Sequence, residues 1–109
     1  MKPMIITKFV KSTPTNVYTA NKDNEVVTFI NCANLDSSLG HPITLYVVPD
    51  GKSPSDENVI IKQYMIAPTD CLQMDLKLVL SKGDSIFAQT DQDDRLNCTV
   101  SVAIPPSFT

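Results

Sequence analysis

Apolar and polar side chains alternate through residues 72–80 of the stretch CLQMDLKLVL, and this limits the possible folds more than any other feature. An amphipathic helix would instead need apolar residues at i, i+3, i+4 and i+7. Period-two alternation predicts a strand with one buried face. We expect Met74 and Leu76 to be core residues near the centre of that face. The residues predicted to point inward are Leu72, Met74, Leu76, Leu78 and Leu80.

Further runs rich in β-branched and aromatic residues lie between turn signals that recur roughly every 8 to 15 residues. These runs are residues 4–10, 25–32, 43–48, 59–66, 85–90 and 97–104. The run 59–66, VIIKQYMI, has a polar middle at Lys62 and Gln63. The pattern predicts an all-β protein, with one domain over residues 1–109. We expect a single antiparallel β-sandwich of about seven to eight strands, either jelly-roll or immunoglobulin-like.

The composition is that of a globular protein. Hydrophobic residues make up 42% of the 109 residues and charged residues 19%, so a disordered chain is excluded. The net charge of −3 argues against binding of nucleic acid, which requires a basic surface. The start, MKPMIITKFVKSTP, has too short an apolar stretch for a signal peptide or a membrane span. We expect synthesis in a cytosol and no membrane partner.

Three cysteines, Cys32, Cys71 and Cys98, give an odd count that argues against a closed disulfide framework. The 66-residue spacing of Cys32 and Cys98 would fit the two sheets of an immunoglobulin domain. The chain has no Trp, however, and Leu96 stands where such a domain carries its corner Tyr. We therefore expect three free thiols that act as small buried hydrophobes.

No residues in the sequence form a recognisable catalytic or metal site. His41 is the single histidine, and its place between Gly40 and Pro42 predicts an exposed loop residue. The cysteines include no CxxC pair, so the spacing of a zinc site is absent. The turn Asp91–Asp94 lacks the glycine and the distal glutamate of an EF-hand loop. We expect no enzymatic activity, no cofactor and no metal.

The polar insert at residues 50–58 is longer than is needed to close a hairpin, which can turn in two residues. Loops of this kind are either idle or contact elements. Alternation places Tyr46 and Val48 on the second face of the preceding strand, where they would form an apolar patch or pack against another layer. The residues predicted to form an interface are Tyr46, Val48, Asp50, Lys52, Asp56 and Glu57.

The order of several short motifs resembles a family of small virion proteins of tailed bacteriophages. The motifs are VYTA at residues 17–20, VVTFINCAN, ITLYVVPDG, LSKGD at residues 80–84, and a terminal CTVSVAI. The resemblance extends over residues 17–104. It implies a non-enzymatic structural subunit that docks in many symmetric copies, as a homo-oligomer, in a virion made in the host bacterial cytoplasm. The implied partners are major capsid, neck or tail subunits, and capsid decoration, neck and tail positions are all open.

The alternative function is a carbohydrate- or host-receptor-binding module of a phage tail, which would also be a β-sandwich. Such modules stack sugars on exposed aromatic side chains. This chain has no Trp, and Tyr18, Tyr46 and Tyr64 belong to three different predicted elements. The sequence therefore favours the structural subunit.

Overall fold

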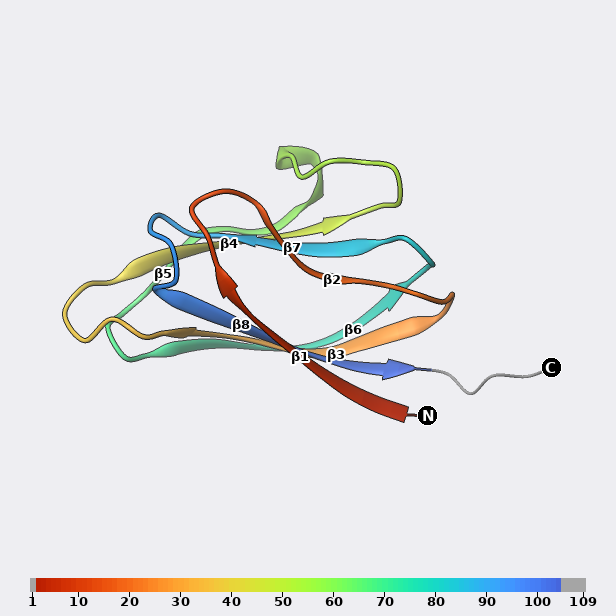
Figure 1. Ribbon diagram of the computed structural model, residues 1–109, viewed down its shortest axis with the longest axis horizontal. Helices are drawn as coiled ribbons and strands as arrows, with labels where there is room; N and C mark the ends of the chain where they lie inside the picture. The colour runs from red at the N-terminus through yellow and green to blue at the C-terminus, as the bar shows by residue number, and fades with distance from the viewer. Residues whose placement is uncertain (1, 105–109) are drawn as a thin grey trace.

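A computed structural model describes residues 2–104, and these residues form an all-β protein, as predicted (Figure 1). The one helical segment is the 3₁₀ turn η1, Asp56–Asn58. No helix in this part of the chain has the length and apolar character needed to cross a bilayer. The strands are β1 Lys2–Val10, β2 Thr15–Thr19, β3 Glu25–Asn34, β4 His41–Val48, β5 Val59–Ile66, β6 Cys71–Leu80, β7 Ser85–Gln89 and β8 Leu96–Ile104.

The strands form two four-stranded sheets that face one another as the layers of a sandwich (Figure 1). Sheet A has the order β1-β8-β3-β6, and sheet B has the order β2-β7-β4-β5. Neighbouring strands are antiparallel throughout. This order of eight strands is that of a jelly roll. The structure therefore decides between the two sandwich types that the sequence left open.

The core lies between the sheets and is made of the alternate residues of each strand. Val27, Leu45 and Val100 are completely buried at its centre. Leu72, Met74, Leu76 and Leu78 point toward this core, as their alternation predicted, but they are only half-buried. The reason is that β6 is an edge strand of sheet A and has a neighbour on one side only.

Strand β2 is the element that the pattern of the sequence did not predict. It has five residues, and its register with β7 shifts between Asn16 and Tyr18. Because of this bulge, the consecutive residues Val17 and Tyr18 are both buried, which breaks the period-two alternation.

The cysteines are free, but they are not placed as expected. Cys32 and Cys98 are buried opposite one another on β3 and β8, with 3.7 Å between their Sγ atoms. They therefore lie within one sheet rather than across the two sheets. Cys71 is exposed, so the expectation that all three cysteines are buried was wrong for this residue.

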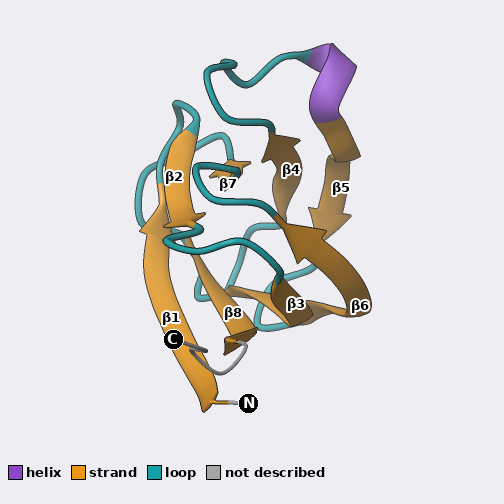
Figure 2. Cartoon of the chain, turned by 90° about the vertical axis from the view of Figure 1, so that its right-hand side faces the viewer, coloured by secondary structure: helices purple, strands orange, loops and turns teal. Residues whose placement is uncertain are grey.

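The connections between strands gather at the two ends of the sandwich, and hydrogen bonds join those at each end. At one end, the amide of Leu35 donates to the carbonyl of Arg95, and the amide of Thr69 donates to Asp36. At the other end, the amide of Asp50 donates to the carboxylate of Asp84. The long connection from β4 to β5 carries η1 at this second end (Figure 2).

The difference in burial between the centre and the edge of the sandwich predicts a difference in stability. Leu45→Ala should lower the free energy of unfolding by about 2 to 5 kcal/mol, because a fully buried side chain leaves a cavity. Leu76→Ala should cost less, about 1 to 2 kcal/mol, because its side chain is half-exposed already. Urea titration followed by circular dichroism measures both. An equal loss for the two variants would contradict the assignment of β6 to an edge.

Candidate functional site

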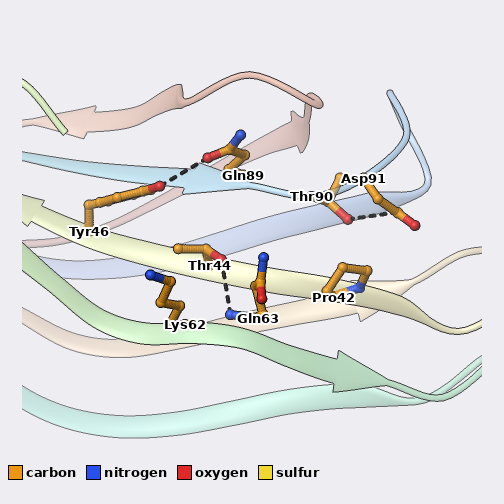
Figure 3. Close-up of a pocket in the computed structure, with 8 residues that line it drawn as sticks. All are labelled: Pro42, Thr44, Tyr46, Lys62, Gln63, Gln89, Thr90 and Asp91. Atoms are coloured by element: carbon orange, nitrogen blue, oxygen red, sulfur yellow. Dashed lines mark hydrogen bonds between the residues drawn. The ribbon is translucent and has the colours of Figure 1, made fainter. Parts of the chain in front are cut away.

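The outer face of sheet B is hollowed between β7, β4 and β5 (Figure 3). The hollow has a volume of about 300 Å³ and is lined by six polar side chains together with Pro42 and the ring of Tyr46. Three strands supply them, so the hollow depends on the register of the sheet and not on one loop. The residues around it are Pro42, Thr44 and Tyr46 from β4, Lys62 and Gln63 from β5, and Gln89, Thr90 and Asp91 from β7 and the turn that follows.

A bulge in β5 places two consecutive side chains in the hollow. Leu45 pairs with Ile61 and Ile43 pairs with Tyr64, so Lys62 and Gln63 together stand opposite the single residue Thr44. The backbone amide of Gln63 donates to Thr44 Oγ1 at 3.0 Å (Figure 3). A regular strand would have turned one of these two side chains toward the core.

Gln63 adopts a backbone conformation that is unfavourable for its residue type. Its φ is 50°, in the left-handed region, whereas the other non-glycine residues with positive φ lie in turns between strands. Such a conformation costs about 1 to 2 kcal/mol for a residue with a Cβ. Strain of this kind gathers at functional sites and persists where the surrounding structure holds it. Gln63 is therefore the feature that marks the hollow as a candidate site.

Tyr46 forms the aromatic part of the hollow, and its position is fixed. Its hydroxyl donates to Gln89 Oε1 at 2.9 Å, and Gln89 Nε2 donates in turn to the carbonyl of Ser12 at 3.0 Å. Phe87 stands opposite Tyr46 on β7 and belongs to the same outer face. Figure 3 shows the Tyr46 side chain extended toward Gln89.

His41 positions Asp91, one of the residues that line the hollow. The prediction that His41 is an exposed loop residue was wrong. It is the first residue of β4, and only 1% of it is exposed. Its Nδ1 lies 2.7 Å from Asp91 Oδ1, and its Nε2 lies 2.9 Å from Asp36 Oδ2. With a carboxylate on each nitrogen, both nitrogens act as donors, which is the protonated form of the ring. Asp91 is thereby fixed at the rim.

The two carboxylates also determine how this group titrates. The hydrogen bond to Asp36, together with the bond to Asp91, raises the pKa of His41 above its ordinary value of 6.5. The same bond from His41, with amide bonds from Ser38 and Leu39, lowers the pKa of Asp36 well below its usual range. His41 and Asp36 therefore stabilise each other's charged forms as an ion pair.

The insert at residues 50–58 is an ordered loop with its own hydrogen bonds. Ser55 and Asn58 form a capping box around η1, in which Asn58 Oδ1 accepts from the amide of Ser55 at 3.1 Å. Asp50 packs against Gly83, where an added Cβ would lie 2.4 Å from its carboxyl carbon. Lys62 Nζ lies 3.1 Å from Asp56 Oδ1, so an ion pair connects the loop to the hollow.

The structure separates the residues that the sequence predicted to form one interface. Lys52 and Glu57 line a second hollow of about 360 Å³ within the loop. Tyr46 is half-buried in the hollow on sheet B. Val48 is 2% exposed and offers almost no surface to a partner, so it cannot form an exposed patch with Tyr46.

Sequence reasoning missed Thr44, Gln63, Gln89 and Asp91 as neighbours in one site. A signal was nevertheless present, because Lys62 and Gln63 interrupt an otherwise apolar strand. Two adjacent polar residues at that position are typical of a bulge that exposes both side chains.

Comparison with known proteins supports the fold but identifies neither a family nor a function. No protein-family model matches the sequence, and no curated protein matches it. A solved structure described as "Bacillus endospore appendages form a novel family of disulfide-linked pili" has a TM-score of 0.54 and 11% identity, covering 96% of this chain and 87% of that one. A chain of infectious bursal disease virus, strain Gx, has a TM-score of 0.38 and 11% identity, covering 100% of this chain and 34% of that one. The second score is too low to support an argument.

The paired histidine predicts a particular pH dependence of stability. Because the pKa of His41 is raised on folding, its contribution is complete below pH 6.5 and is lost as the pH rises through the folded pKa. The lowered pKa of Asp36 means that its contribution is present above pH 3.8 and is lost as the pH falls through its folded pKa. His41→Gln should therefore cost about 2 kcal/mol near pH 5.5 and less near pH 9. Urea unfolding of both proteins at the two pH values measures this, and a loss that does not change with pH would show that the ring is neutral.

The left-handed conformation of Gln63 predicts that two substitutions change the stability of the fold by different amounts. Gln63→Gly should change the free energy of unfolding by less than about 1 kcal/mol, because relief of strain offsets the entropy of glycine. Gln63→Val should lower it by about 1 to 3 kcal/mol, because a β-branched residue tolerates this conformation poorly. Thermal unfolding of the two variants provides the test. A larger loss for Gln63→Gly than for Gln63→Val would mean that residue 63 has ordinary strand geometry.

Proposed function

We propose that this chain is a non-enzymatic structural subunit of a bacteriophage virion, bound in many symmetric copies to capsid, neck or tail proteins. The observation that carries the proposal is that the domain leaves large apolar side chains exposed on two separate surfaces. Exposed apolar patches mark sites of protein contact. Two such surfaces allow one copy to contact two different neighbours, as a subunit with heterologous contacts in a ring or shell does.

The first surface is the outer face of sheet A. Ile5 is 71% exposed and Phe9 is 54% exposed on β1, and Val79 is exposed on β6 at the opposite edge. The strands between them contribute uncharged residues to this face, because Ile5 pairs with Ser101 and Ser101 pairs with Phe29. Strand β1 pairs with β8 over nine residues without a register shift, so its outer edge is regular. A regular edge presents unpaired backbone groups that another chain can contact.

The second surface lies beside the turn that precedes β4. Met65 is 61% exposed on β5, and a Cβ at Gly40 would lie 3.1 Å from its Sδ atom. Leu39, the neighbour of Gly40, is also exposed, as is Leu35 at the start of the same turn. This surface belongs to the edge of sheet B and to the turn between β3 and β4. A partner bound to it would not compete with one on sheet A.

Two further observations support the proposal. The motifs between residues 17 and 104 resemble virion proteins of tailed phages, and the fold is similar to that of a solved structure of Bacillus endospore appendages, which form disulfide-linked pili. Each contact can be weak, because many copies hold the subunit through multivalency. We assign the loop residues Asp50, Lys52, Asp56 and Glu57 to the polar rim of such contacts.

The test is the occupancy of purified particles. Host cells that produce the phage without this chain are complemented with the wild-type chain, Phe9→Asp or the control Lys22→Ala, and copies per particle are counted by quantitative mass spectrometry. Phe9→Asp should reduce occupancy at least about tenfold, because a charge would be buried in the interface. Lys22→Ala, on an exposed position of the turn between β2 and β3 and outside both surfaces, should leave occupancy unchanged.

Circular dichroism of each variant shows whether the fold is retained. Absence of the wild-type chain from particles would overturn the virion function itself. Normal occupancy by a folded Phe9→Asp variant would exclude the outer face of sheet A as the contact.

A further inference from the structure

We infer that the hollow on the outer face of sheet B binds a neutral saccharide, a binding activity beyond the docking proposed above. The ligand class follows from three properties of the hollow. The charged groups of Lys62 and Asp91 are already paired within the protein. The amide of Gln63 and one carboxylate oxygen of Asp91 have unused hydrogen-bonding capacity. The third property is the aromatic ring of Tyr46, whose hydroxyl is hydrogen-bonded.

The charged groups around the hollow are paired with other residues of the protein, and this favours a neutral ligand over an ionic one. The positive charge of Lys62 is paired with Asp56 at 3.1 Å, and the negative charge of Asp91 is paired with His41 at 2.7 Å. Each charge is thus partly compensated within the protein, which weakens the attraction of the hollow for a phosphate, sulfate or ammonium group. A neutral, hydroxylated ligand can bind without disturbing either pair.

The unused hydrogen-bonding groups match vicinal hydroxyls. Among residues 2–104, no hydrogen-bond partner is found for the side-chain amide of Gln63, which offers a donor and an acceptor side by side. Asp91 accepts from His41 through Oδ1, and its Oδ2 has no partner within the same residues. A sugar hydroxyl donates and accepts at once, so it can satisfy an amide and a carboxylate that are near one another.

The aromatic ring of Tyr46 gives the hollow an apolar wall. The hydroxyl of this ring donates a hydrogen bond to Gln89 (Figure 3). Gln89 in turn donates to the carbonyl of Ser12. The face of an aromatic ring is electron-rich and attracts the weakly positive C–H groups of a sugar. Little conformational entropy is lost on binding, because the ring is already immobile.

The strain at Gln63 is explained by this function. The left-handed conformation and the bulge that contains it bring Lys62 and Gln63 onto the same face as Thr44. The volume of about 300 Å³ is at the lower limit for ligand sites, so one or two sugar units would fit. Binding at one site should be weak, and many copies on one particle would raise the overall avidity.

The experiment uses the full chain and an array that contains neutral, sialylated and sulfated glycans, followed by titration of the bound glycan in solution by NMR. The wild-type chain should bind neutral glycans with a Kd in the millimolar range or below. Gln63→Gly should weaken binding at least tenfold while it retains the fold, because glycine accepts the same φ. Tyr46→Leu should weaken it similarly, and the control Gln73→Ala, on sheet A, should bind as the wild type does.

Three outcomes would overturn the inference. They are no binding of any glycan at millimolar concentration, binding of acidic glycans only, and unchanged affinity in a folded Gln63→Gly variant. If an extended peptide, tested as a random decapeptide mixture, shifts the resonances of Gln63 and Gln89 and the glycans do not, the hollow is a polypeptide site. Failure here leaves the virion proposal intact, because particle occupancy is measured independently.

Discussion

The bridge from Asp36 through His41 to Asp91 determines how one end of this sandwich is arranged. It joins the turn before β4 to the turn after β7, two segments 50 residues apart in the chain. Asn34 extends the same network, since its side-chain amide donates to the carbonyls of Leu39 and Ile66. A buried charge is stable only when it is paired and hydrogen-bonded. These turns must therefore keep their relative positions for the ring to stay protonated, and the hollow beside them depends on the same condition.

The hollow on sheet B combines this fixed end with an irregular edge strand. On β4 and β7 the pairing is regular and places Tyr46, Thr44 and Gln89 at defined positions. On β5 the register shifts twice, and one shift exposes both Lys62 and Gln63. Edge strands can accept such irregularity because they have a neighbour on one side only. The same shifts make β5 a poor template for pairing with another chain, in contrast to β1.

Runs of β-branched and alternating apolar residues between turn signals were sufficient to predict seven of the eight strands, although the bulges within β3 and β5 interrupt strict alternation. This signal failed for β2, where a bulge buries the consecutive residues Val17 and Tyr18. The choice between jelly roll and immunoglobulin-like sandwich depends on which distant strands pair, and local patterns do not contain that information. The burial of His41 could not be predicted for the same reason, since Asp91 reaches it only after β4 and β7 have paired. The hollow could not be predicted for both reasons. It requires three strands paired in one register, and it requires a bulge.

The position of β8 in sheet A has a consequence for the order of folding. Of the strands that the structure describes between residues 2 and 104, it is the last in chain order, yet it lies in the interior of the sheet, between β1 and β3. Within sheet A, β1 has no other neighbour, so β1 cannot form its ladder until β8 has been made. Folding should therefore be slow, as in other proteins dominated by distant contacts. During synthesis on the ribosome, Ile5 and Phe9 remain without their final strand partner until residues 96–104 have emerged, and at that stage the chain is most exposed to aggregation.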